Sequence, residues 1–457
     1  MNSIFSTGNA FTPAGKMTTR SSRVSDASRF SIGFECLDRK MFDDRKMYPN
    51  LANLGVKWAR VQTGWSQCEK EKGVFDFAWL DAIVDTLLSI GIQPWFNCTY
   101  GNQLYTPEAT HQTAIGWTPM YKAEAAEGWV RFVARLAKHY KGRVTHFEIW
   151  NEPDLNGHAH FWRPYTRDPF KYTELVKISA ASIRKANPQA FIIGGAFAHG
   201  LDTYVEDCLN CGIADVSDAI TYHFYGKNPD EKYEDYAKKV RETVHRRRSI
   251  PVWQGESGVP SGMQTEQAMA GIPWTEEAQA KWLLRRSLLD VINNTPFISY
   301  FHAADFSHYI TDRFVEHTYY YGVMRADGSM KPSFQAYQSI CSLFGDATKY
   351  RGHEGGYLFD ANGDIKGVPV HAFFRNGKGL TVFWKGVDLL EPYAPPNVSI
   401  RIPHEHATGM TDPVIIDTIT QEVFRITKKE KREREWVFSD IPLIDYPIII
   451  TDATTVL

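Results

Sequence analysis

Two glutamates in this sequence stand at the ends of short apolar segments that are typical of buried strands. Glu152 lies in an Asn-Glu-Pro motif after the apolar run 144–150, and the proline ends the strand because it lacks a backbone donor. Glu256 closes a similar apolar segment, 250–256. Because the carboxyl ends of parallel strands meet at one edge of a sheet, we expect both carboxyl groups at that edge, where α/β proteins bind ligands. Two carboxyl groups placed in this way can cleave a glycosidic bond.

The two glutamates would have to differ in protonation to cleave such a bond with retention of configuration. We predict that Glu152 is the general acid and base, whose pKa must be raised by burial and by nearby negative charge. We predict that Glu256 is the nucleophile, which must stay ionised and therefore needs cationic or hydrogen-bonding neighbours. The two carboxyl groups should then lie about 5–5.5 Å apart.

The segments that must position these residues alternate between strand-like and helix-like patterns over residues 30–345. Short apolar segments indicate strands at 30–36, 56–62, 92–98, 144–150, 190–196, 218–224, 250–256 and 297–304. Amphipathic stretches between them indicate helices at 80–90, 124–140, 172–186, 233–248 and 276–293. This alternation predicts an α/β fold, a (β/α)8 TIM barrel. An open doubly wound sheet would need a Gly-rich turn after an early strand, and the sequence has none.

Three further residues are candidates for the neighbours that Glu256 needs. Arg60, on the second predicted strand, can supply a positive charge to Glu256 or form a structural ion pair with Glu148. His223 and Tyr225 are two positions apart on the sixth predicted strand, so they share one face of it. If that face points into the barrel, either side chain can donate a hydrogen bond to Glu256.

These residues together resemble the retaining glycoside hydrolases of clan A, in which an Asn-Glu-Pro motif is followed about three strands later by a strand-end glutamate. Within the clan, the sequence most resembles glycoside hydrolase family 39, the group of β-xylosidases and α-L-iduronidases. The resemblance covers roughly residues 30–345. Its closest matches are Glu148 to Asp154, Trp162, Asp168 and Tyr172.

The resemblance implies an enzyme that cleaves β-type, equatorial glycosidic bonds by double displacement through a covalent glycosyl-enzyme intermediate. It implies a carbohydrate substrate and neither a cofactor nor a metal. Arg60 matches the barrel arginine of the clan, and His223 or Tyr225 matches a sixth-strand residue that contacts the nucleophile. Asn151 would donate to the 2-hydroxyl of the sugar, a contact that strengthens in the transition state.

The sequence departs from the clan at two places. Gly255 precedes the predicted nucleophile, where many relatives have threonine or serine. The eighth predicted strand ends in His302 and Asp305 rather than in the tryptophan typical of the clan, and we expect one of these to contact the substrate. Glu35 and Asp38, at the end of the first predicted strand, add polar groups that can bind sugar hydroxyls. The identity of the sugar therefore stays open.

Long connections follow the third, seventh and eighth predicted strands, at 99–119, 257–274 and 305–331. In a barrel such loops form the rim of the active site. Their aromatic residues can stack on sugar rings or pin the loops to the barrel. We select Trp117 from the first of these loops, and Trp162, which follows shortly after the Asn-Glu-Pro motif, as candidate sugar contacts.

Beyond residue 346 the pattern contains strand-like segments only, which predicts an antiparallel β-sandwich over 346–457. The polar segment 1–29 can lend this sandwich a strand. We find no catalytic motif in the sandwich and expect a structural role for it. Trp384 and Trp436 are the only tryptophans in it that could support an independent carbohydrate-binding function.

Composition excludes several classes of partner. The formal net charge is −2, which argues against the strongly basic face that nucleic-acid binding requires. No apolar run approaches the roughly 20 residues of a membrane span. The N terminus lacks the apolar core of a signal peptide, so we expect a cytoplasmic protein, or a secreted one if a signal peptide was removed. The oligomeric state stays open, and a homo-oligomer is compatible with the sequence.

Two other functions fit parts of the sequence. A metal-dependent hydrolase on the same barrel could use His158 and His160, but such enzymes usually carry this pair after the first strand, which has no histidine here. Cys208 and Cys211 form one Cys-x-x-Cys pair, whereas a structural zinc site needs four ligands. A sugar-binding barrel without catalysis is the second alternative, and the presence of both carboxyl groups and Asn151 argues against it.

Overall fold

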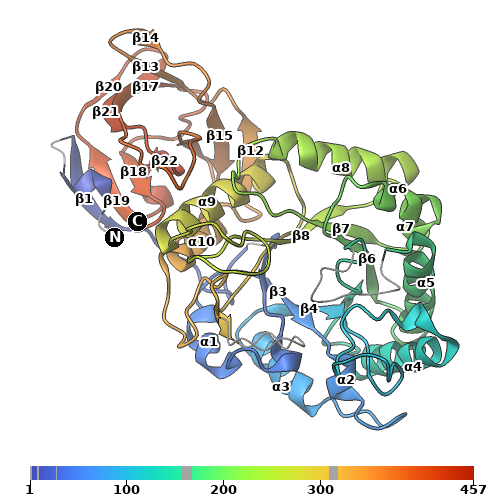
Figure 1. Cartoon of the computed structure of the whole chain (residues 1–457). Coiled ribbons are helices and arrows are strands. Elements are labelled where there is room, and N and C mark those ends of the chain that lie inside the picture. The colour runs from blue at the N-terminus through green and yellow to red at the C-terminus, as the bar shows by residue number, and fades with distance from the viewer. Residues whose placement is uncertain (1–2, 8–9, 27, 156–166, 308–317) are drawn as a thin grey trace.

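A closed barrel of eight parallel strands forms the larger part of the chain (Figure 1). The computed structural model describes residues 3–7, 10–26, 28–155, 167–307 and 318–457. The strands follow one another around the barrel in chain order, and each lies within or near a predicted segment. They are β2 (Phe30–Gly33), β3 (Trp58–Gln62), β4 (Gln93–Cys98), β5 (His146–Ile149), β6 (Phe191–Phe197), β7 (Ala219–His223), β8 (Val252–Ser257) and β9 (Ile298–Tyr300). The predicted (β/α)8 fold is confirmed.

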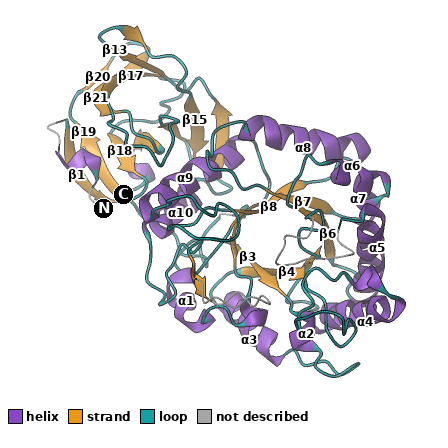
Figure 2. Ribbon diagram, viewed as in Figure 1, coloured by secondary structure: helices purple, strands orange, loops and turns teal. Residues whose placement is uncertain are grey.

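Helices surround the barrel and bury their apolar faces against the strands (Figure 2). Asp168 begins α5 by accepting a hydrogen bond from the Lys171 backbone N–H at 2.9 Å, and Thr275 begins α9 in the same way. The helices are α1 (Asp44–Leu51), α2 (Trp65–Cys68), α3 (Ala78–Ser89), α4 (Ala123–His139), α5 (Pro169–Ala186), α6 (Thr203–Asn210), α7 (Ile213–Val216), α8 (Tyr233–Arg247), α9 (Glu276–Ile292) and α10 (Pro332–Leu343).

Several of these helices, among them α1, α6 and α10, were not predicted from the sequence. The helices α1 and α6 have eight residues each, and so short a segment shows too few turns for its periodicity to stand out. Pro49 lies inside α1 and further weakens the helical pattern there. Among the described residues, no helix is both long and apolar enough to cross a bilayer.

Two antiparallel sheets form the predicted β-sandwich. The larger sheet has the order β1-β19-β18-β22-β16-β15-β12 and the smaller has the order β14-β13-β17-β21-β20. Their strands are β1 (Phe11–Lys16), β12 (Thr348–Gly352), β13 (Tyr357–Asp360), β14 (Gly363–Asp364), β15 (Val370–Arg375), β16 (Lys378–Phe383), β17 (Asn397–Pro403), β18 (Pro413–Asp417), β19 (Glu422–Ile426), β20 (Lys429–Lys431), β21 (Glu435–Pro442) and β22 (Ile448–Asp452). The last barrel helix ends at Leu343, so the change of pattern falls between Leu343 and Thr348.

The N-terminal segment contributes the edge strand of the larger sheet. Within β1, Phe11 pairs with Ile426 and Lys16 pairs with Glu422 of β19. Phe5, in the 3₁₀ turn Ile4–Thr7, packs edge-on against Phe11 with 4.9 Å between the ring centroids. Figure 1 shows this N-terminal strand beside the C-terminal domain although the two are far apart in the sequence.

Neither tryptophan selected in the sandwich offers an exposed face for a sugar. Trp384 and Trp436 are both buried. The Trp384 indole stacks on His371 and donates to Asp230, which lies in the barrel domain. Carbohydrate binding through these two rings is therefore excluded by their burial.

We predict that the N-terminal segment is part of the sandwich core, so that Phe5→Ala lowers the free energy of unfolding by about 3–5 kcal/mol. Phe5 is 1% exposed and also contacts Phe424 of β19, so its removal leaves a cavity under the sheet edge. Urea unfolding measures the change. Val24→Ala, at a side chain that is 69% exposed, is the control and should alter stability by about 0.5 kcal/mol or less. A Phe5→Ala protein as stable as the parent would contradict this packing.

Candidate active site

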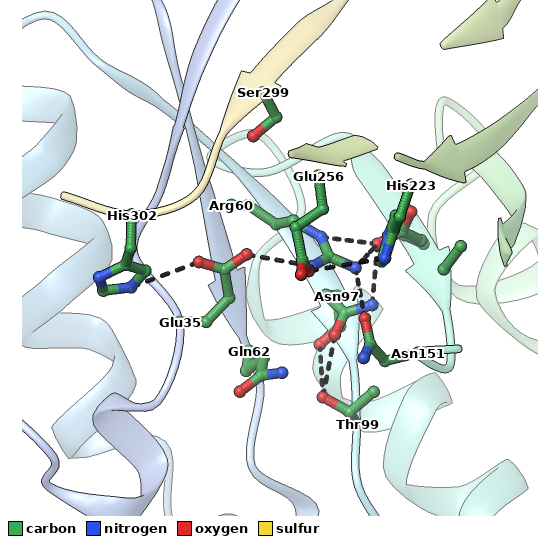
Figure 3. A network of polar contacts seen from close by, with 12 residues as sticks. Glu35, Arg60, Gln62, Asn97, Thr99, Asn151, His223, Glu256, Ser299 and His302 are labelled. Carbon is green, nitrogen blue, oxygen red and sulfur yellow. Dashed lines mark hydrogen bonds and ion pairs between the residues drawn. The ribbon is translucent and has the colours of Figure 1, made fainter. Parts of the chain in front are cut away.

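One buried guanidinium connects the acidic residues at the open end of the barrel. Arg60 is fully buried, and its Nη1 donates to Glu35 Oε1 at 3.0 Å and to Glu256 Oε2 at 2.6 Å. Its Nε and Nη2 donate to Glu148 Oε2 at 2.9 and 2.5 Å, and Nη2 also donates to Asn151 Oδ1 at 2.8 Å. Figure 3 shows Arg60 at the centre of this network, with Glu35 between it and His302. Arg60 therefore bonds both of its predicted partners, Glu148 and Glu256.

The strands of the barrel bring these residues to one place. Glu148 lies on β5 next to Asn97 of β4, and His223 of β7 lies beside Glu256 of β8 in the strand register. Because side chains on a strand alternate between its two faces, each of these strands can place such a polar residue inside the barrel while its neighbours in sequence point toward the helices. A register shift between Tyr222 and His223 adjusts β7 against β8 at this point.

Glu256 is held as a carboxylate by three neighbours. Tyr225 Oη donates to Glu256 Oε1 at 2.6 Å, while Arg60 donates to Oε2 and His223 Nδ1 lies 3.8 Å from Oε2. Burial alone would raise the pKa of Glu256, but the charges of His223 and Arg60 and the Tyr225 hydroxyl lower it below its usual value. Of the two sixth-strand candidates, Tyr225 is thus the one that donates to Glu256.

Glu152 has the opposite environment. Burial is the main cause that raises the pKa of Glu152, and the negative charge of Glu256 raises it further. His223 Nδ1 lies 3.0 Å from Glu152 Oε1, and this contact favours the ionised form without cancelling the rise. Burial would lower the pKa of His223, but the charge of Glu256 and the hydrogen bond with Glu152 raise it overall. The imidazole therefore contacts one carboxyl group and lies near the other.

The backbone around Glu152 is held in an unfavourable conformation. Trp150 and Glu152 both have positive φ angles, of 68° and 47°, which are uncommon outside glycine. Backbone hydrogen bonds fix both residues: the Trp150 N–H donates to Cys98 O at 3.1 Å, and the Glu152 N–H donates to Ala196 O at 3.0 Å. Conformations of this kind persist only where surrounding contacts enforce them, and they are common at functional sites.

The two carboxyl groups form a close pair. Oxygen atoms of Glu152 and Glu256 and a ring nitrogen of His223 all lie within 4.8 Å of one another. Two glutamates and a histidine at such distances are also a donor set for a divalent cation. However, the permanent charge of Arg60 is bonded to Glu256 Oε2 and would repel a cation there. The contacts therefore favour two carboxyl groups that are each held by neighbouring side chains over a metal site. His158 and His160 lie outside the described residues.

Glu35 and His302 form a buried pair beside Arg60. His302 Nε2 lies 3.4 Å from Glu35 Oε2, and burial lowers the pKa of His302 to about 4. Burial also raises the pKa of Glu35, against the opposing effect of Arg60, to about 7. Asp305 occupies a different contact, because it bonds Lys331 at 2.6 Å and the Gly322 N–H at 2.9 Å. The structure therefore brings His302, but not Asp305, into the Arg60 network.

The structure gives less support to a sugar contact for the two selected tryptophans than for the residues around Arg60. Trp117 is half-buried and packs edge-on against Tyr121, with 5.1 Å between the ring centroids. Trp162 lies outside the described residues. Their contact with a sugar stays a prediction.

Sequence reasoning missed several polar residues that complete the network. Asn97 Nδ2 donates to Glu148 Oε2 at 2.8 Å and to the Trp150 carbonyl at 2.6 Å, and Thr221 Oγ1 donates to Glu148 Oε1 at 2.5 Å. Asn151 Nδ2 donates to Tyr100 Oη at 3.3 Å. A polar residue inside an otherwise apolar strand was the available signal for Asn97 and Thr221. Both are fully buried.

Comparison with known proteins agrees with this geometry. The model of glycosyl hydrolases family 39 matches residues 55–390. A β-xylosidase of Geobacillus stearothermophilus is 26% identical over 179 residues, which are 36% of this chain and 34% of that protein. A β-xylosidase of Caldicellulosiruptor saccharolyticus is 24% identical over 335 residues, which are 64% of this chain and 63% of that protein. The matched regions thus span less than two thirds of either relative.

A solved structure supports the fold. A family 39 glycoside hydrolase from the gut symbiont Bacteroides cellulosilyticus WH2 aligns with a TM-score of 0.67 at 20% identity, covering 93% of this chain and 81% of that one. The family model matches well over half of the residues of the present chain. The chain therefore belongs to glycosyl hydrolases family 39.

Proposed function

We propose that this chain is a retaining glycoside hydrolase that cleaves β-type, equatorial glycosidic bonds through a covalent glycosyl-enzyme intermediate. One observation carries the proposal: Glu152 and Glu256 approach within 4.8 Å, and their pKa values are shifted in opposite directions. A close pair leaves no room for a water molecule between the sugar and the second carboxylate, whereas inverting enzymes need about 6.5–9.5 Å.

In the first step Glu256 attacks the anomeric carbon while Glu152 transfers its proton to the departing oxygen. The Glu256–carbon bond forms as the glycosidic bond breaks, and the leaving alcohol takes the proton. In the second step ionised Glu152 removes a proton from water, whose oxygen attacks the same carbon and releases Glu256. The raised pKa of Glu152 supplies the acid for the first step, and the lowered pKa of Glu256 keeps the nucleophile ionised.

The surrounding residues have distinct parts in this cycle. Arg60 and Tyr225 hold Glu256 through one oxygen each, which orients the carboxylate. His223 contacts Glu152 and can stabilise the charge that appears on it after proton transfer. The Oδ1 atom of Asn151 accepts from Arg60 and its Nδ2 donates one N–H to Tyr100 Oη, so the second amide N–H is our candidate donor to the 2-hydroxyl of a sugar. No cofactor is needed for these steps.

For the substrate we propose a β-xyloside or a closely related β-glycoside, because two relatives are named β-xylosidases. Glu35 and His302 lie on the far side of Arg60 from Asn151 in the network and are our candidates for binding other hydroxyls of the same sugar. Trp117, Trp162 and Asp305 stay candidates for more remote contacts. A panel of aryl β-xyloside, glucoside, galactoside, fucoside and arabinoside tests the choice of sugar.

Separate substitutions should distinguish the two glutamates. Glu152→Ala should lose most activity on substrates with poor leaving groups but should still form the glycosyl-enzyme from an activated aryl glycoside. Added azide needs no base, so it should restore turnover and give a glycosyl azide of retained configuration. Glu256→Ala should fail on every substrate, and any azide product should be inverted. Product analysis by NMR decides, and exchanged behaviour of the two variants would reverse the assigned roles.

The pH dependence should follow from the two pKa shifts. Activity needs ionised Glu256 and protonated Glu152, so kcat/KM should rise through a pKa below about 4.3 and fall through one above it. Because an activated aryl glycoside needs no acid, Glu152→Gln should remove the basic limb on that substrate and keep the acidic one. An unchanged basic limb in this variant would assign that limb to another group.

The first-formed sugar should have the configuration of the substrate. Proton NMR of the anomeric signal during early hydrolysis of an aryl β-glycoside should show the β-anomer before mutarotation. The same assay in a chelator separates the metal-dependent alternative, since the proposed mechanism needs no metal and should keep its full rate. An α-anomer as first product, or loss of activity in chelator that zinc restores, would contradict the mechanism.

A further inference from the structure

The loop that carries Tyr225 lies between the barrel and the sandwich. It joins β7 to α8 as residues 224–232, and its first residue is fixed to the nucleophile strand because the Phe224 N–H donates to Glu256 O at 3.2 Å. Two residues later, Trp282 Nε1 of α9 donates to Gly226 O at 2.9 Å. Tyr225 is thus held from the barrel side on both of its neighbours.

The other end of the same loop is held by the second domain. Asp230 Oδ1 accepts a hydrogen bond from Trp384 Nε1 of the sandwich at 3.1 Å, and its other oxygen pairs with Arg285 of α9. Arg285 Nη1 in turn donates to Val387 O at 2.8 Å. Lys227 pairs with Asp388 at 2.6 Å. Figure 1 shows α9 and the start of α8 beside the sandwich, where this loop runs.

Burial makes the Asp230 contact the stronger of the two anchors. Trp384 and Arg285 are almost fully buried, and Trp384 also stacks on His371 with 5.3 Å between the ring centroids. The Lys227–Asp388 pair is far more exposed, at 45% and 40% for the two side chains, and such pairs contribute little. Fixing Asp230 therefore restricts the four residues, 226–229, that separate it from Tyr225.

We propose that the β-sandwich positions Tyr225 against Glu256, with Asp230 as the positioning residue that transmits the contact. The inference rests on the proposed function, because it concerns the hydrogen bond that orients the nucleophile. The second domain then contributes to catalysis by holding this loop. It acts by keeping the loop 224–232 in the conformation in which the Tyr225 hydroxyl reaches Glu256.

The test compares Asp230→Ala with Tyr225→Phe. Losing a hydrogen bond to a carboxylate should raise the pKa of that carboxylate, so the acidic limb of kcat/KM should move to higher pH in both variants. We expect kcat/KM to fall about tenfold or more in Tyr225→Phe and by a smaller factor in Asp230→Ala. In the double variant Asp230→Ala should add less than about threefold to Tyr225→Phe, because residues that act through one contact are not additive.

Asp445→Ala is the matched control. It breaks the 2.9 Å contact between Lys281 of α9 and Asp445 of the sandwich, which lies at the same domain interface and is not a hydrogen bond to the loop 224–232. Its acidic limb should stay where it is in the parent. Trp384→Phe, which keeps an aromatic ring on His371 and removes only the indole N–H, provides the readout if Asp230→Ala folds poorly by circular dichroism.

Three results would overturn the inference: an unmoved acidic limb in Asp230→Ala and Trp384→Phe, an equal shift in Asp445→Ala, or full additivity in the double variant. Failure of the proposed function is seen separately, because the azide products of the Glu152→Ala and Glu256→Ala variants do not depend on Asp230.

Discussion

The site depends on a single buried positive charge shared by three carboxyl groups. Arg60 bonds Glu35, Glu148 and Glu256 inside the barrel, and although burial opposes its charge, these carboxylates raise the pKa of the guanidinium well above its usual value. One guanidinium cannot neutralise three carboxylates and the nearby Glu152 as well. Ionising all of them in a buried site would be costly, so some must take up protons.

The contacts determine which carboxyl groups become protonated. Glu256 has Tyr225 and His223 in addition to Arg60 and so remains ionised, whereas Glu152 has no direct contact with Arg60 and its pKa is raised. Glu35 shares Arg60 but faces the neutral His302, and its pKa rises to about 7. In the proposed mechanism, the acid and the nucleophile thus differ because of how one positive charge is distributed, without any difference in residue type between them.

Features that depend on residues close together in the sequence, such as the barrel strands, were predictable from the sequence. Each barrel strand is a short apolar segment, and Glu152 and Glu256 are candidates because they stand at the ends of such segments. What the sequence could not show is which groups meet in three dimensions. His223 and Tyr225 were equal candidates for Glu256, and the register shift on β7 together with the turn after it places them on different carboxyl groups. The helices α1 and α6 were too short for a periodicity to be visible.

Contacts between the two domains could not be predicted from the sequence either. Trp384 was a candidate for sugar binding because the sequence of a short strand does not show whether an aromatic side chain on it is buried or exposed. Its actual partner, Asp230, is in the barrel, and only the packed structure joins the two. Asp305 likewise stands near His302 at the end of a predicted strand. In the structure its carboxyl group is paired with Lys331, which comes from another part of the chain.

The covalent intermediate is the central claim, and trapping it is the most direct test. An activated 2-deoxy-2-fluoro β-glycoside of the preferred sugar slows both steps, and its good leaving group lets the first proceed faster than the second. Intact-protein mass spectrometry should then show one added sugar per chain, and peptide mapping should place it on Glu256. A label on Glu152 or Glu35, or continued hydrolysis of the parent glycoside with no label formed, would contradict the account.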